Sequence, residues 1–394
     1  MRVLHLTSEY PPVIWGGLGT AVGGLTKASA QAGIDIDVLL IRHAGDEMSY
    51  GHKISATTSR DQTQRRVLAG NVTCFTLAHE NASANAIRLA RQLQPDVIHI
   101  HPVELWPVAQ ALHQALGIPI VYTVHSLNLA EYEVGKEPPE ILNLWRLQQA
   151  LIAGATRVIV LTQDEKELLL AACPAVGDRV RIVGNGIEDH EGARRAAQRA
   201  KVGRAPLVLY AGRFVDRKGI HELLAAIPGV LRAAPETRFV LAGGYGCGAD
   251  IERAWLPPAL APYRDQIHFT GWLKPAQVAE WYAQADILVA PSWYEPFGMV
   301  ILEGMLYGLP IVATNVGGPA EILRDGQTGL LVPAKDSVAL ADALQRLVTN
   351  APLRCQLGAT AATEVRNKWL WPQIVEKMRA VYDEAMGLAC ISRG

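Results

Sequence analysis

The sequence predicts an α/β protein of two domains, each a doubly wound parallel sheet with helices on both faces. The chain has 394 residues, and a single hydrophobic core stops growing beyond about 250–300 residues. Short apolar runs alternate with helical patterns throughout, which is the βα repeat of a parallel sheet. The alternation breaks once, after residue 183, and then restarts as a second series.

The first series contains apolar runs of strand length separated by helical patterns. The runs are Val3–Leu6, Ile36–Ile41, Val72–Leu77, Val97–Ile100, Ile118–Val124 and Val158–Leu161. The helical patterns cover 84–93, 105–116, 141–153 and 163–172. Residues 42–70 are the exception, because they are polar and rich in Ser, Thr, Gly and Arg. They predict a long surface loop that faces ligands.

The domain boundary is placed at the glycines after Val180–Val183, where a charged segment runs to Arg204. We expect an N-terminal domain at 1–184, a linker at 185–205, a C-terminal domain at 206–370, and a helix at 371–394 able to cross back to the first domain. The second series of strands is expected at Leu207–Ala211, Phe239–Ala242, Ile267–Thr270, Ile287–Ala290 and Ile311–Thr314. The basic run in the linker has mostly alanine spacers and no aromatic residue to stack, so it predicts a solvated face rather than a nucleic-acid or membrane contact.

The composition excludes several classes of function. The net charge of -1, with 49% hydrophobic and 19% charged residues, indicates no general attraction to nucleic acid or anionic membrane. The five cysteines are scattered, without a C-x-x-C pair, so we expect neither zinc nor redox chemistry. No signal peptide and no apolar run of about 18 residues occurs. We therefore expect a cytoplasmic protein without a membrane span, a metal or a cofactor, and the sequence does not indicate its oligomeric state.

Two carboxylates, Glu295 and Glu303, frame a loop that turns into a helix after the expected strand Ile287–Ala290. The first N–H groups of a helix are unpaired and lie at the positive end of its dipole. Phe297, Gly298, Met299 and Val300 could therefore hold phosphate oxygens. The glutamates would then bind neutral hydroxyl groups.

Two further motifs could hold phosphate, each with a plainer alternative. Gly16-Gly17-Leu18-Gly19 follows the first strand and precedes a helical pattern, so its backbone could approach a phosphate or simply form a tight turn. Arg213 and Lys218 follow the first strand of the second series, at the sheet edge where open α/β sheets bind ligands. They could grip a diphosphate or be solvated cations.

Histidines end two strands of the first series. His125 follows the run 118–124, where it would either point into an interdomain cleft or make a structural hydrogen bond. His99 and His101 lie two residues apart, on one face of a strand. We expect no metal there, because no cysteine or third ligand lies near them in the sequence.

Together these residues resemble the retaining glycosyltransferases of family 4, which have the GT-B fold of two Rossmann-like domains that face a cleft. The resemblance covers essentially the whole chain, and its most specific element is the Glu-x7-Glu signature at Glu295 and Glu303. Supporting matches are Gly16-Gly17, His125, Asn185-Gly186-Ile187, Gly212-Arg213, Lys218-Gly219, Gly243-Gly244 and Gly271-Trp272-Leu273.

The resemblance implies a nucleotide-sugar donor as substrate of an enzyme of carbohydrate biosynthesis. Arg213 and Lys218 would hold its diphosphate, and Glu303 the ribose hydroxyls. Glu295 and His125 would contact the donor sugar. The remaining donor-binding positions implied are Gly16, Gly17, Gly243, Leu273, Phe297, Gly298, Met299 and Val300, and the catalytic set is His125, Arg213, Lys218 and Glu295.

The family chemistry implies retention, with the leaving phosphate taking the acceptor proton and no metal. Preorganised cations and N–H groups would stabilise the charge that develops on that phosphate. The opening Ser8–Pro12, His101 and the stretch 122–125 are similar to the glycogen and starch synthases, which carry a lysine where this chain has Trp15. We therefore expect a UDP-sugar rather than ADP-glucose.

The acceptor is not indicated beyond a carbohydrate or a small hydroxyl compound. Candidate contacts in the first domain are Trp15, His101, Glu104, Trp106 and Asn128. Three alternatives stay open. A nucleotide-sugar epimerase or hydrolase would need no acceptor, and a binding protein would show no turnover. A retaining glycoside hydrolase needs two carboxyl groups about 5–5.5 Å apart across a glycosidic bond. It is disfavoured, because one glutamate in a loop and one in a helix beside a phosphate site suit donor binding better.

Overall fold

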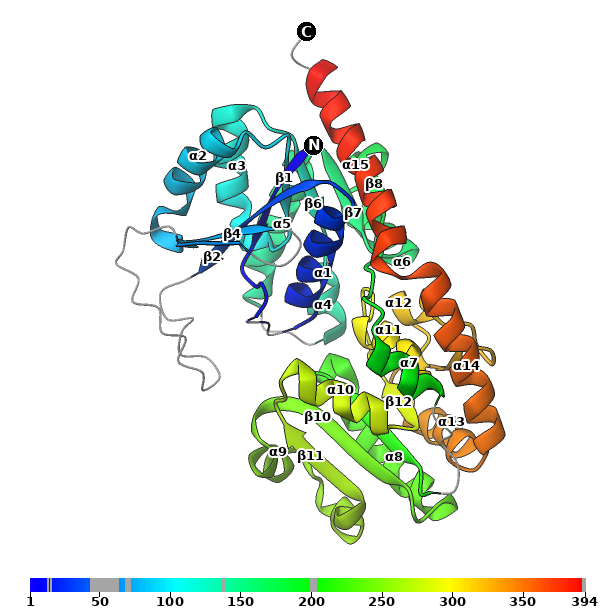
Figure 1. The fold of residues 1–394 in the computed structure, drawn as a ribbon. Helices are drawn as coiled ribbons and strands as arrows, with labels where there is room; N and C mark the ends of the chain where they lie inside the picture. Colours follow the sequence, from blue (N-terminus) through cyan, green and yellow to red (C-terminus); the bar gives the residue numbers. More distant parts are fainter. Residues whose placement is uncertain are drawn as a thin grey trace. The chain divides into compact units, whose positions relative to one another are not determined.

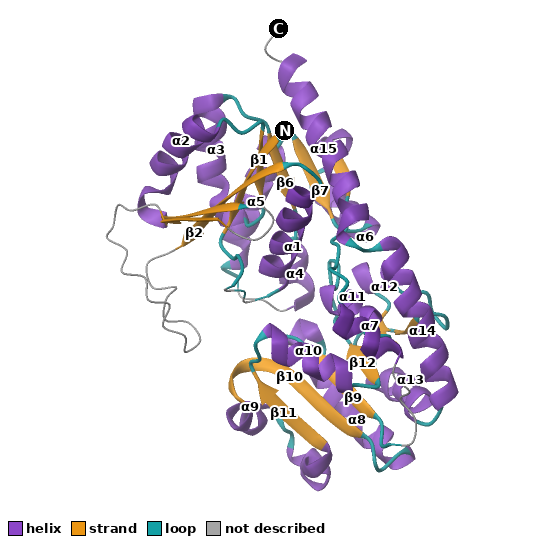
Figure 2. Ribbon diagram, viewed as in Figure 1, coloured by secondary structure: helices purple, strands orange, loops and turns teal. Residues whose placement is uncertain are grey.

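The computed structural model describes residues 1–12, 14, 16–42, 64–67, 72–135, 139–198 and 204–391, and their elements are drawn in Figures 1 and 2. The chain divides into two compact units. The first comprises Met1–Tyr132, Pro138–Gly186 and Trp371–Gly394, and the second Glu133–Glu137 and Ile187–Leu370. Each unit has its own mainly parallel sheet, which confirms the predicted fold class.

The first unit is built on an eight-stranded sheet of order β3-β4-β2-β1-β5-β6-β7-β8. Its strands are β1 (Arg2–Thr7), β2 (Asp35–Arg42), β3 (Gln64–Val67), β4 (Thr73–Ala78), β5 (Val97–Ile100), β6 (Ile120–Thr123), β7 (Arg157–Val160) and β8 (Val180–Ile182). All pairs are parallel except β3 with β4. Because β1, β5 and β6 are adjacent and parallel, the loops that follow them lie at one edge of the sheet.

The helices of the first unit include one from the far end of the chain. They are α1 (Gly17–Gln31), α2 (Ala82–Leu93), α3 (Trp106–Leu116), α5 (Ile141–Gly154), α6 (Gln163–Ala172), α15 (Trp371–Ile391) and α4 (Asn128–Gly135), of which residues 133–135 belong to the second unit. Helix α15, red in Figure 1, packs against α1. Its Trp371 ring leaves room only for glycine at Gly24, where a Cβ would lie 2.3 Å from the indole nitrogen. Glu384 of α15 pairs with Arg157 and Arg181 at 2.8 Å each.

The second unit is built on a six-stranded parallel sheet of order β11-β10-β9-β12-β13-β14. Its strands are β9 (Leu207–Ala211), β10 (Arg238–Cys247), β11 (Ile267–Gly271), β12 (Ile287–Ala290), β13 (Ile311–Thr314) and β14 (Gly329–Val332). Its helices are α7 (Glu191–Gln198), α8 (Ile220–Ala233), α9 (Gly248–Trp255), α10 (Pro275–Gln284), α11 (Met299–Leu306), α12 (Gly317–Ile322), α13 (Ser337–Val348) and α14 (Ala351–Lys368). The strand order reverses between β9 and β12, which is where doubly wound sheets bind ligands.

The structure corrects two details of the prediction. Residues 64–67, expected in a surface loop, form the antiparallel edge strand β3, whose exposed Arg65 and Arg66 hide the strand signal. Residues 191–198, expected as part of a solvated linker, form helix α7, which buries Ala193 and Ala196. The polar face of α7 remains exposed. Among the described residues, no helix is both long and apolar enough to cross a membrane.

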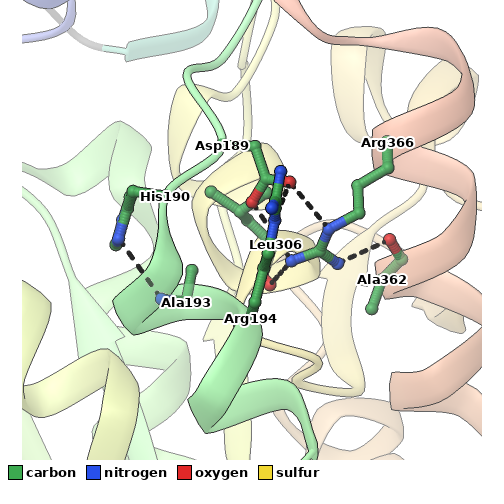
Figure 3. A network of polar contacts seen from close by, with 7 residues as sticks. All are labelled: Asp189, His190, Ala193, Arg194, Leu306, Ala362 and Arg366. Carbon is green, nitrogen blue, oxygen red and sulfur yellow. Dashed lines mark hydrogen bonds and ion pairs between the residues drawn. The ribbon is translucent and has the colours of Figure 1, made fainter.

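A buried carboxylate ties the segment before α7 to two other helices (Figure 3). Asp189 accepts hydrogen bonds from Arg194 Nε at 2.8 Å and from Arg366 Nε at 3.1 Å. Arg366, on α14, also donates to the carbonyl oxygen of Leu306 at the end of α11. Burial alone would raise the pKa of Asp189, but the bonds from Arg194 and Arg366 outweigh it and lower that pKa.

We expect Asp189→Asn to lower the free energy of unfolding by about 1–3 kcal/mol at pH 7. Because the folded-state pKa of Asp189 is lowered, its stabilisation is present above the unfolded-chain pKa of about 3.9. It is lost as the pH falls through the folded value. Urea unfolding at pH 7 and pH 3 measures this, with exposed Asp342→Asn as the control. An equal difference at both pH values would contradict it.

Candidate functional site

The loop from β12 to α11 carries the two-carboxylate motif and is held by close backbone approaches. Gly298 precedes α11 with φ +94°, a conformation that favours glycine. The Gly318 N–H donates to the Glu295 carbonyl oxygen at 2.9 Å. A Cβ at Gly318 would lie 1.9 Å from the Phe297 carbonyl oxygen. The backbone of Glu295–Gly298 is therefore fixed against the start of α12.

An ion pair joins this loop to the loop after β9. Lys218 Nζ lies 2.5 Å from Glu295 Oε2, with the two side chains 19% and 12% exposed. The loops meet at Gly219, which has φ +69° and where a Cβ would lie 1.8 Å from the Pro291 carbonyl oxygen. Burial lowers the pKa of Lys218, the charges of Arg217 and Arg213 lower it further, and Glu295 opposes them.

The other donor residues expected in the second unit lie at the same sheet edge. Arg213 is exposed, and its carbonyl oxygen accepts a bond from Tyr210 Oη at 2.8 Å. A Cβ at Gly243 would lie 1.9 Å from the Gly212 carbonyl oxygen, so the residue that follows β9 touches the second half of β10. Leu273 follows β11 and is partly exposed. Arg213, Lys218 and Glu295 thus form one charged cluster, whereas Arg217 is buried.

Glu303 lies in the second half of α11, and Tyr282 of α10 donates a hydrogen bond to its carboxylate. Tyr282 Oη donates to Glu303 Oε2 at 2.6 Å, and the Tyr282 ring stacks on Tyr307. Burial raises the pKa of Glu303, and the bond from Tyr282 opposes that rise. The role of Tyr282 could not be predicted, because nothing in the sequence distinguishes it from other core aromatic residues of a helix.

In the first unit, three histidines form a chain of hydrogen bonds that ends at His125. His5 Nδ1 lies 2.9 Å from His101 Nε2, and His101 Nδ1 lies 3.1 Å from His125 Nε2. Burial lowers the pKa of His5 to about 3 and that of His125 to about 4, although His125 keeps some exposure. Burial and the neighbouring histidines hold the pKa of His101 well below its usual value. All three rings are therefore neutral at pH 7.

The sequence predicts no metal at His99 and His101 because no third ligand lies near them along the chain, but the fold brings a third histidine, His5, next to them. Nitrogen atoms of His5, His99 and His101 lie within 4.8 Å of one another. Hydrogen bonds nevertheless occupy both ring nitrogens of His99 and of His101, and the Nδ1 of His5. His99 bonds to Tyr382 Oη at 2.8 Å and to Thr123 Oγ1 at 2.7 Å, and His101 bonds to His5. Because metal ligation would break these bonds, the contacts favour a hydrogen-bonded structural cluster.

Gln148, on α5, fixes the loop that follows His125. Its amide donates to Tyr122 Oη at 2.8 Å and to the Ser126 carbonyl oxygen at 2.9 Å. Its Oε1 accepts the Asn128 N–H at 2.9 Å. Gln148 is buried, so these bonds hold residues on both sides of His125. Its role could not be predicted from the sequence, because no motif surrounds it.

The residues expected to contact the acceptor differ in how far their side chains are exposed. His101 and Trp106 are 2% and 7% exposed. Trp106 lies against Gly154, where a Cβ would be 2.5 Å from its ring. Their burial therefore argues against these two residues as acceptor contacts. Glu104 is exposed and Asn128 partly exposed, whereas Trp15 lies outside the described residues.

The glycine loop of the first unit is open. Gly16 and Gly17 are exposed at the start of α1, and a Cβ at Gly16 would meet no atom within 4 Å. Local packing therefore does not require glycine at position 16.

A separate small pocket in this unit is bordered by His101, Thr123, His125, Asn185 and Trp371, among others.

Comparisons with known proteins match both halves of the chain. The family descriptions are "Glycosyltransferase Family 4" over residues 15–191 and "Glycosyl transferases group 1" over residues 205–350. The chain is 31% identical to a glycogen synthase of Mycobacterium tuberculosis, over 97% of this chain and 94% of the relative. It is 31% identical to a D-inositol 3-phosphate glycosyltransferase of Frankia alni, over 88% and 89%. The solved sucrose-phosphate synthase of Thermosynechococcus elongatus has the same fold, with a TM-score of 0.78 and 24% identity over 98% of this chain and 99% of that one.

Proposed function

Because the chain belongs to family 4 of the glycosyltransferases, we propose that this GT-B enzyme transfers a hexosyl unit from a nucleotide sugar to a hydroxyl acceptor. The donor we propose is a UDP-sugar, and the transfer retains the anomeric configuration without a metal. The observation that carries this proposal is the cluster of Arg213, Lys218 and Glu295 at the strand-order reversal of the second sheet.

Lys218 and Arg213 are the proposed diphosphate contacts. Lys218 is paired with Glu295 in this structure, so its ammonium group is already oriented. A diphosphate would replace Glu295 as its partner and free that carboxylate for sugar hydroxyls. The negative charge of the diphosphate would also offset the burial and the positive neighbours that lower the pKa of Lys218.

The start of α11 supplies the proposed neutral contacts. The N–H groups of Met299 and Val300 lie in its first turn, where helical N–H groups have no partner within the helix. They can bind a phosphate or sugar oxygen. Glu303 is proposed for the ribose hydroxyls, oriented by Tyr282.

The proposed reaction breaks the bond between the anomeric carbon and the diphosphate oxygen, which keeps the electron pair. The acceptor oxygen bonds to the anomeric carbon on the same face, and its proton passes to the leaving phosphate. The cations stabilise the charge on that phosphate more in the transition state than in the ground state. His125 is neutral at pH 7, with a pKa of about 4, so it would contact the sugar through a neutral imidazole.

A donor panel tests this function. UDP-, ADP- and GDP-sugars are compared by thermal shift and by transfer to a broad panel of carbohydrate acceptors, with the product anomer assigned by NMR. At a hundred times its Kd, a donor stabilises the fold by about 2.7 kcal/mol. We expect a UDP-sugar to give the largest shift and a retained anomer, with EDTA without effect. A sugar isomer or free sugar formed from donor alone, binding without turnover, or loss of activity in EDTA would each contradict the proposal.

We expect Tyr282→Phe to weaken UDP binding about tenfold, because it removes the hydroxyl that orients Glu303. One hydrogen bond to a charged group contributes about 1.5–3 kcal/mol. The phenylalanine ring can still stack on Tyr307, so the loss of stability should not exceed that of the hydrogen bond itself. Calorimetry with UDP measures the loss, and Tyr263→Phe, remote from Glu303 in the sequence, is the control. Unchanged affinity would show that Tyr282 does not support the ribose contact.

A further inference from the structure

We propose that His5 and His101 are positioning residues that hold His125 in the tautomer with its proton on Nδ1, so that His125 presents an N–H donor to its ligand. This rests on the proposed contact between His125 and the donor sugar. Neither His5 nor His101 needs to touch that ligand. They act through two hydrogen bonds between imidazole rings, at 2.9 and 3.1 Å.

A chain of three neutral imidazoles has only two consistent proton arrangements. A neutral imidazole carries one N–H and one acceptor nitrogen. If His101 donates from Nδ1 to His125, its Nε2 must accept from His5. If His101 donates from Nε2 to His5, its Nδ1 must accept from His125. The first arrangement leaves the proton of His125 on Nδ1, and the second places it on Nε2.

The surroundings of His5, the histidine furthest from His125 in this series of hydrogen bonds, decide between the two arrangements. His5 Nε2 is buried and has no hydrogen-bond partner among the described residues. In the second arrangement that atom would carry a buried N–H without an acceptor. In the first it carries only a lone pair. Buried N–H groups without a partner are rarer than under-satisfied acceptors, so the first arrangement is favoured.

Packing around the three histidines holds their rings in place. The His5 and His101 rings are stacked, with an interplanar angle of 8°. His99 lies against both rings but cannot redirect the chain, because Tyr382 and Thr123 occupy its two nitrogens. Gln148 holds the loop that follows His125. The protons can therefore reverse only together.

The tautomer decides what His125 offers to a ligand. Its Nε2 is occupied by His101, and its Nδ1 makes no hydrogen bond within the described part of the chain. With the proton on Nδ1, His125 donates to an oxygen of the ligand. In the opposite tautomer it could only accept a bond from a hydroxyl group. The hydrogen bonds between the three histidines thus link an unprotonated Nε2 on His5 to a protonated Nδ1 on His125, which is the donor offered to the ligand.

The first test is the ring spectrum of the intact protein without substrate. Two-bond and three-bond 15N–1H correlations of histidine-labelled protein distinguish the two tautomers, and the His125→Asn variant assigns the signal. His113 is an internal reference, because its Nδ1 faces the Ile118 carbonyl oxygen at 2.8 Å and must carry the proton. We expect His125 to match His113. An Nε2–H pattern or an averaged signal would overturn the proposal.

The second test changes only the far end of the chain. At position 5, asparagine can donate from an amide at the place of Nδ1, whereas the similar carboxylate of aspartate can only accept. We expect His5→Asn to keep the His125 tautomer and to leave kcat within about threefold. We expect His5→Asp to reverse the tautomer or protonate the chain, and to lower kcat about a hundredfold, the loss typical of one misplaced donor.

Unchanged kcat and an unchanged His125 spectrum in folded His5→Asp would overturn the proposal. If that variant does not fold, His101→Asp and His101→Asn apply the same comparison one ring nearer to His125. The spectrum needs no activity. An Nδ1–H signal in a protein without transferase activity would therefore refute the proposed function and leave the tautomer assignment intact.

Discussion

Lys218→Met should lower kcat for glycosyl transfer about a hundredfold or more. The substitution keeps most of the aliphatic stem but removes the ammonium group that we propose to contact the leaving diphosphate. One such contact typically contributes about a hundredfold or more to kcat. Steady-state kinetics with the identified donor measure the loss. Lys218→Arg should recover part of it, because the positive charge returns on a side chain of different shape.

The control for this experiment is Lys368→Met. Lys368 also pairs with a glutamate, Glu364, at 2.8 Å, but it is more than half exposed near the end of α14. Its removal should leave kcat within about twofold, since Lys368 is not among the proposed donor contacts. If Lys218→Met and Lys368→Met were equally active with the donor still bound, the phosphate role of Lys218 would be wrong.

Gly219→Ala should be the most damaging small substitution in the second unit. The new methyl group would lie 1.8 Å from the Pro291 carbonyl oxygen, so the loops that carry Lys218 and Glu295 would have to separate. We expect a loss of about 3 kcal/mol or more in the free energy of unfolding, together with most of the activity. Urea unfolding and kinetics measure the two effects.

Gly326→Ala is the matched control for Gly219→Ala. Both glycines have φ +69°, but a Cβ at Gly326 would meet no atom within 4 Å. The control therefore carries the backbone strain alone, about 1 kcal/mol. Similar losses for the two variants would show that strain, and not the contact with Pro291, explains the effect.

The strands of the second sheet were largely predictable, because parallel strands buried on both faces read as continuous apolar runs. The predicted bounds of β9, β12 and β13 agree with the structure. Elements without such a run were missed. The polar edge strand β3, the short helix α4 and the basic helix α7 carry weak local signals, and tertiary packing decides their structure.

The site was predictable only where its residues share a motif. Glu295 and Glu303 frame one loop, and Arg213 and Lys218 follow one strand, so their positions relative to a sheet edge could be inferred. The partners Tyr282, Gln148 and His5 come from other elements. His5 faces His99 only because β1 pairs with β5 in that register. Strand order is not written in any local pattern, so these contacts could not be foreseen.

The position of α15 has a consequence for synthesis on the ribosome. Ile187 and Leu370, where the chain enters and leaves the second unit, pair with each other, so that unit can close as soon as residue 370 has emerged. The first unit cannot close then, because Trp371 and the buried Tyr382 belong to its core. Domains generally fold as units during translation. The unit that begins to emerge first is therefore completed last. Until α15 emerges, the apolar face of α1 that α15 later covers is exposed to chaperones.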